Sequence, residues 1–126
     1  MRTSKERGAV AVEFALLAPV LILMLFGIVE FGRAYNAQVS LTNAAREGVR
    51  VVAITQSQSA ARTAAKNAAV TLNPALQDSN ITFSPTAAGC AVGTQKTVTI
   101  KYTLNTITGF VGPFNMTGKA VMLCGG

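Results

Sequence analysis

The sequence contains no histidine and no tryptophan, and Asp78 is its only aspartate. The remaining acidic residues are four glutamates, at Glu6, Glu13, Glu30 and Glu47. These residues provide no paired carboxylates, no nucleophile with a basic partner and no set of metal ligands. The glycines do not form a phosphate-binding loop either. We therefore expect that the protein is not an enzyme, with no catalytic residue, no cofactor and no bound metal.

Lysine and arginine outnumber the acidic residues, and the formal net charge is +6. A basic protein can attract nucleic acid or acidic lipid. Here the basic residues are spread along the chain without a dense run, and no aromatic residues are interleaved with them as a stacking platform. We expect a mildly basic, solvated surface, with neither a nucleic-acid partner nor a small-molecule substrate.

The longest apolar stretch runs from Ala9 to Val29, and Glu13 is its only charged residue. Its length of about 21 residues is close to the ~20 that a helix needs to cross the hydrocarbon core of a membrane. A carboxylate at membrane depth costs about 2.5–3.5 kcal/mol, so Glu13 requires a partner. We expect residues 9–30 to form a transmembrane helix in contact with membrane lipid.

Three simple interpretations explain this stretch incompletely. A secretory signal peptide would have a shorter apolar region, of about 7–15 residues, followed by a small-residue cleavage site. A buried helix is disfavoured because a chain of 126 residues cannot easily surround a helix that is apolar on all sides. A plain membrane anchor explains the length, but neither Gly8 nor Glu13.

A fourth interpretation is cleavage by a peptidase between Gly8 and Ala9. Ala9 would then carry a new α-amino group, and Glu13 lies four residues further on, on the same helical face. The ammonium and the carboxylate could neutralise each other, within one subunit or between neighbours. A short basic leader, a glycine before the cut and a glutamate at the fifth mature position are typical of type IV prepilins.

Three segments between about Arg7 and Arg50 together closely resemble the TadE-like family of the tight-adherence (Flp) pilus system: Arg7–Val20, Gly27–Ala34 and Asn43–Gly48. The resemblance implies a minor pilin or pseudopilin of the pilus assembly apparatus, cut by a prepilin peptidase after Gly8. Its other partners would be pilus or pseudopilus subunits, and its location the cytoplasmic (inner) membrane. The alternative is an uncleaved, single-pass, membrane-anchored α+β binding module.

Residues 1–8 form a basic leader, for which we expect no regular structure. Arg2, Lys5 and Arg7 outnumber Arg33 and Arg46 on the other side of the apolar stretch. The positive-inside rule therefore predicts a single-pass protein with a cytoplasmic N-terminus and an extracytoplasmic C-terminal domain.

Pro19 lies inside the apolar stretch and removes the hydrogen bond to the carbonyl of Ala15, which should kink or loosen the helix. Membrane helices tolerate such a proline. Two interpretations stay open: simple tolerance, or a bend that lets the helix leave lipid and pack in a filament.

Residues 31–73 have the pattern of a helical extension and a second helix. One helical face of the extension carries Leu41, Ala45, Val49 and Val52, and Arg46, Glu47 and Arg50 lie off it. We expect one helix from about Ala11 to about Ile54. An alanine-rich helix should follow, with Ser57 or Ser59 as its N-cap, and end at Asn73-Pro74.

Alternating apolar and polar residues in 74–126 predict a small antiparallel β region. The expected strands are 80–84, 97–104 and 119–124, separated by segments rich in glycine, proline and threonine. The predicted fold class is α+β: a long membrane-spanning helix that continues as a spine, a short second helix and a small antiparallel sheet. This arrangement is pilin-like.

Cys90 and Cys124 are the only cysteines. In an exported domain with a small core, a disulfide between them would be a strong stabiliser, and two unrelated buried thiols are the alternative. Two thiols alone make a poor zinc site, because structural zinc takes four ligands.

Overall fold

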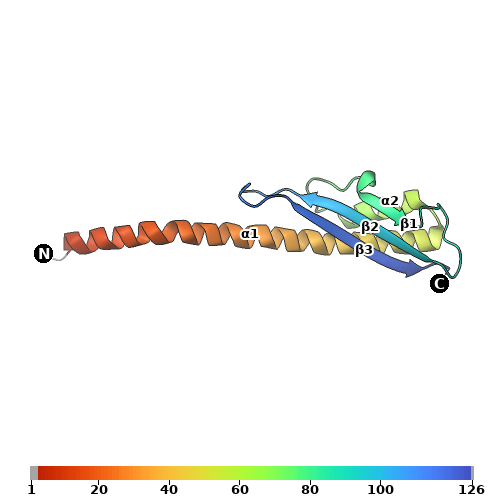
Figure 1. Ribbon diagram of the computed structural model, residues 1–126, viewed down its shortest axis with the longest axis horizontal. Helices are drawn as coiled ribbons and strands as arrows, with labels where there is room; N and C mark the ends of the chain where they lie inside the picture. Colours follow the sequence, from red (N-terminus) through yellow and green to blue (C-terminus); the bar gives the residue numbers. More distant parts are fainter. Residues whose placement is uncertain (1–2, 126) are drawn as a thin grey trace. The chain divides into compact units, whose positions relative to one another are not determined.

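A computed structural model describes residues 3–125 and shows an α+β protein, as predicted (Figure 1). In chain order the elements are α1 (Thr3–Thr55), α2 (Gln58–Ala68), the 3₁₀ turn η1 (Asp78–Asn80), β1 (Ile81–Ser84), β2 (Gln95–Leu104) and β3 (Phe114–Leu123). The chain divides into two compact units, Met1–Arg33 and Ala34–Gly126. The first unit holds the apolar part of α1, and the second holds the rest of α1 and all other elements.

The start of α1 differs from the sequence prediction, and its end agrees with it. The helix begins at Thr3 rather than near Ala11, so residues 3–8 are helical rather than irregular. They contain no proline, and extending an existing helix requires no new nucleation. Arg2, which contributed to the positive-inside argument, lies outside the described residues. The helix continues through Pro19 and ends at Thr55, one residue beyond the predicted end.

The second unit is built on one face of α1. The predicted stripe is buried throughout: Leu41, Ala45 and Val52 are fully buried, and Val49 is 2% exposed. Ala37 and Ala44 extend the stripe, and all of these residues belong to one apolar core with α2 and the sheet. The charged residues predicted to lie off this face are partly or fully exposed: Arg46, Glu47 and Arg50. The prediction of an amphipathic extension is confirmed.

α2 begins as predicted and ends early. The hydroxyl of Ser57 accepts a hydrogen bond from the backbone N–H of Ala60 at 3.1 Å, which makes Ser57 the N-cap. The helix ends at Ala68 rather than at Asn73-Pro74. Val70 and Thr71 follow the C-cap residue Ala69, and β-branched residues are poor helix formers because their side chains crowd the preceding turn. Ala61 and Ala65 are fully buried against the core.

The sheet has three antiparallel strands in the order β1-β2-β3. The inward residues of β2 are all buried: Val98, Ile100, Tyr102 and Leu104. The alternation predicted for β2 is therefore confirmed. β3 starts at Phe114, five residues before the predicted Lys119, and pairs with β2 along its whole length. The weak alternation of β3 in the sequence hid this half of the strand.

Glycine lets β3 approach α1 closely. A Cβ atom on Gly118 would lie 2.5 Å from the carbonyl oxygen of Leu41, a separation that real side chains do not adopt. One turn earlier on α1, the Gln38 side-chain amide donates to the carbonyl oxygen of Thr117 at 3.0 Å. These contacts fix β3 along the helix and leave no space for a larger residue at position 118.

A buried lysine, which sequence analysis did not single out, holds the loop that carries Cys90. Lys96 is 1% exposed, and its ammonium donates to the carbonyl oxygens of Ala87 and Gly89, the latter at 3.2 Å. The Gln58 side-chain amide also donates to the Ala87 carbonyl, at 3.0 Å. The carbonyl of Ala87 therefore has a second side-chain donor, whereas the hydrogen bond shown for the carbonyl of Gly89 comes from Lys96.

Replacing Lys96 with methionine should lower the free energy of unfolding by about 1–3 kcal/mol, because the variant leaves a carbonyl acceptor without its donor. The measurement is chemical unfolding of the full chain in detergent, followed by tyrosine fluorescence; Tyr102 is buried and Tyr35 is exposed, so the change on unfolding comes mainly from Tyr102. Lys101→Met is the matched control, since Lys101 lies on the same strand and is exposed. Equal losses in the two variants would show that the carbonyl contacts of Lys96 do not matter.

Candidate functional site

The predicted processing junction and Glu13 lie on the first turns of α1. Gly8, Ala9 and Glu13 are all exposed. A Cβ atom built on Gly8 meets nothing within 4 Å, so the fold itself does not require a glycine there. Ala9 and Glu13 are four residues apart in a continuous helix and therefore share one face. The junction is therefore exposed within the described unit.

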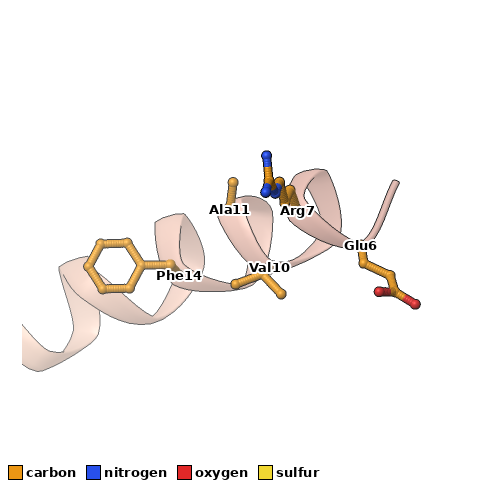
Figure 2. Close-up of a pocket in the computed structure, with 5 residues that line it drawn as sticks. All are labelled: Glu6, Arg7, Val10, Ala11 and Phe14. Atoms are coloured by element: carbon orange, nitrogen blue, oxygen red, sulfur yellow. The ribbon is translucent and has the colours of Figure 1, made fainter. Parts of the chain in front are cut away.

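A shallow hollow lies beside the junction (Figure 2). Its lining residues all come from α1: Glu6, Arg7, Val10, Ala11 and Phe14. A binding site for a small molecule has to bury most of its ligand, which a single helix face cannot do. We interpret the hollow as the boundary at which the polar end of α1 changes to its apolar part.

The apolar part of α1 is exposed on every side within its unit. Its large side chains, from Val10 to Val29, are between 42% and 71% exposed, and none of residues 9–29 is buried. α1 is long and apolar enough to cross a membrane. A helix that is apolar all round and has no protein cover suits lipid as its surroundings.

Glu13 is the one acidic side chain within this apolar surface. Among residues 3–125, the ion pairs are Arg33–Glu30, Arg50–Glu47 and Lys66–Asp78, so Glu13 has no ionic partner in the described chain. The predicted requirement for a partner is therefore not met by the side chains of the same unit. Pro19, six residues further along, is also exposed.

Glu30, the residue directly after the apolar stretch, is buried, with 3% exposure. The Arg33 guanidinium donates to its carboxylate at 3.5 Å. The spacing of three residues between a glutamate and an arginine is a signal that sequence analysis could have used. This pair places a charged boundary directly after the apolar stretch.

Glu47 and Arg50, which the sequence pattern places off the apolar face, form an ion pair on the exposed side of α1. Arg50 donates to both carboxylate oxygens of Glu47, with one contact at 3.1 Å. This hydrogen bonding holds the pKa of Glu47 below its usual value and raises that of Arg50. Both side chains remain largely exposed, so solvent screens the pair and its contribution to stability is small.

Cys90 and Cys124 are joined in a disulfide, with their Cα atoms 5.5 Å apart. The Cys124 N–H donates to the carbonyl of Thr94 at 2.8 Å, and the Gly93 N–H donates to the carbonyl of Cys124 at 3.1 Å. The disulfide thus ties the end of β3 to the loop before β2. Its role is structural, and it lies in a different unit from the processing junction.

Comparison with known proteins supports the resemblance seen in the N-terminal part of the chain. Residues 8–50 match the family model described as TadE-like protein. The match begins at Gly8, covers the apolar stretch and ends at Arg50 within α1. Neither a search of curated proteins nor one of solved structures gave a match. With the apolar helix, the family match indicates a pilus-associated, single-pass membrane protein.

Removing the disulfide by replacing both Cys90 and Cys124 with serine should lower the free energy of unfolding by about 3–4 kcal/mol, because the unfolded chain gains the entropy of an open loop. Chemical unfolding in detergent measures the difference. The reduced wild-type protein is the control, and it should lose a similar amount. Alkylation of both thiols in protein kept from reductant would contradict the pairing.

Proposed function

We propose that this chain is a minor pilin or pseudopilin-like component of a tight-adherence pilus assembly apparatus, cut by a prepilin peptidase between Gly8 and Ala9. The observation that carries the proposal is the family match, which begins at the residue before the proposed cut. Residues 1–7 of the basic leader lie before the match, and the peptidase would remove them together with Gly8. No enzymatic chemistry is needed for this role.

The geometry of α1 supports the cut in two ways. Gly8 has open space around it, so the glycine is not explained by packing within the described unit. A peptidase site that fits only a small residue would explain it. Glu13 has no ionic partner there either, and a new α-amino group on Ala9 would supply one.

The proposed location follows from the same residues. Residues 9–30 would cross the cytoplasmic membrane, with the leader inside and the unit from Ala34 onward outside. The disulfide supports an extracytoplasmic position for this unit, because disulfides persist in oxidising compartments. Other pilus or pseudopilus subunits are the proposed partners, with Glu13 and Pro19 on the helix surface that meets them.

The alternative is a permanently anchored α+β binding module that is never cut. It shares the apolar helix, the disulfide and the folded second unit. It does not explain the position of Gly8 or the single carboxylate of Glu13 within the apolar surface. The mature N-terminus separates the two functions: Ala9 for the pilin, and the intact leader for the anchor.

Cells that contain the assembly system should convert the protein to a form that lacks the first eight residues. Intact-mass analysis of membrane fractions measures this loss. Gly8→Leu should block the conversion because leucine does not fit the tight site before the scissile bond.

The matched control for Gly8→Leu is Gly27→Leu. Gly27 also lies in α1 with nothing within 4 Å of an added Cβ, so the same bulk is added away from the junction. Gly27→Leu should be cut normally. A full-length mass for the wild-type protein in such cells would exclude processing at this site.

Glu13→Gln should leave expression and membrane insertion intact while recovery in complexes with other pilus subunits falls. Glutamine keeps the shape and the hydrogen bonding of the side chain but removes the charge that would pair with an α-amino group. Co-purification with tagged pilus subunits measures the recovery.

Glu6→Gln is the control for this experiment, because it makes the same chemical change within the leader. The processed protein lacks residue 6, so assembly should be unaffected by that variant. Equal recovery of Glu13→Gln and wild type would show that Glu13 merely sits at the lipid headgroups.

A further inference from the structure

The connection between β2 and β3 has an unusual surface. Residues 102–118 contain no charged residue, although the middle of this segment is a loop. Phe110 is 83% exposed, the highest value among the large hydrophobic side chains of the described residues. Ile107 and Val111 in the same loop are 63% and 48% exposed. Exposed loops in water are normally polar, so this composition calls for a specific environment.

The backbone conformation of the loop also keeps Phe110 exposed. The Thr106 hydroxyl donates to the carbonyl of Val111 at 2.9 Å, which closes the tip on itself. Gly109 has φ +73°, a conformation that larger residues rarely adopt. The tip therefore satisfies part of its own backbone hydrogen bonding while its apolar side chains point outward. A loop that enters an apolar environment needs this property.

Contacts within the second unit show which end of it carries the tip. Gln38 contacts Thr117, and the backbone of Leu41 lies against Gly118. Further along α1, Gly48 lies beside Val98, which pairs with Ala120. Lower numbers on α1 therefore correspond to lower numbers on β3. The hairpin tip, which precedes Phe114, therefore lies toward the Ala34 end of this unit rather than the Thr55 end.

Chain length limits how far that end of the unit could lie from a bilayer crossed by residues 9–30. Ala34 follows Val29, the last apolar residue of the proposed span, by five residues, or about 7.5 Å of helix. The headgroup region on each side of the hydrocarbon core is about 5–8 Å thick. Tyr35, at the same end, is 75% exposed and has the aromatic ring and polar tip that favour a membrane interface. With residues 9–30 across a bilayer, the length of helix between Val29 and Ala34 would keep Ala34 within reach of the lipid headgroups.

We propose that the β2–β3 hairpin tip is a second membrane contact, with Phe110 and Val111 inserted among the lipids beside the end of the span. The inference rests on the proposed function only in requiring that residues 9–30 cross a bilayer. It adds an anchor that would fix the second unit against the membrane surface. This anchor would hold the second unit of the monomer in one orientation at the membrane surface before the protein joins an assembly.

The absence of tryptophan from the chain gives a direct test. Three variants of the full-length protein, Phe110→Trp, Ile54→Trp and Phe26→Trp, each carry one tryptophan. They are reconstituted at low protein density into phosphatidylcholine vesicles with or without brominated acyl chains, which quench nearby tryptophan. Phe26 lies within the proposed span. Ile54 is 68% exposed, like the tip, but lies about 30 Å along α1 from Ala34.

The expected result is a blue-shifted emission that brominated lipid quenches at positions 110 and 26, and an unshifted, unquenched emission at 54. Quenching at 26 with emission at 110 like that at 54 would overturn the hairpin contact while leaving the span intact. A blue shift at 110 without quenching would also overturn it and would indicate contact with a second protein copy. Absence of quenching at 26 would overturn the span, and the hairpin contact with it.

Discussion

The burial of one face of α1 is the interaction on which the second unit depends. Leu41, Ala45, Val49 and Val52 are covered by the inner side of β2 and by the alanines of α2. Phe83 and Tyr102 are the aromatic members of this core, and most of its other residues are small or aliphatic, so close approach of the backbones helps to pack it. Gly118 against Leu41 and Gly48 against Ala65 provide that approach. The disulfide and Lys96 then secure the loop that the thin core cannot hold by packing alone.

The two parts of α1 have side-chain patterns that suit different surroundings, lipid for one and the folded protein for the other. Between Ala9 and Val29 it is apolar on all sides, and beyond Ala34 it is apolar on one face only. An α-helix can pass from lipid to protein without loss because its backbone hydrogen bonds are made within the helix. The change from one pattern to the other occurs around Glu30 and Arg33, whose ion pair is the first after the apolar stretch in the described chain. The sequence pattern of α1 thus contains both the membrane segment and the spine of the folded unit.

Periodicity predicted the parts of the fold in which one face is buried and the opposite face is solvated. The stripe of α1 and the alternation of β2 belong to this class, and both are confirmed. The first half of β3 was not predicted. Its inward residues, such as Met116 and Ala120, are only partly buried, which weakens the alternation. The buried Lys96 was missed for another reason. Its partners are backbone carbonyls, and every residue has one, so the sequence does not show which residues contact Lys96.

The candidate site depends on charge rather than on shape. In the chain as described, α1 begins at Thr3, so Glu13 is its eleventh residue and lies beyond the reach of the helix dipole. A cut after Gly8 would make Ala9 the first residue of the helix and would place Glu13 one turn from a free ammonium. The same carboxylate would thereby change from an isolated charge in an apolar surface to one member of an ion pair. The proposed processing step therefore alters the electrostatics of the membrane helix without changing any side chain in it.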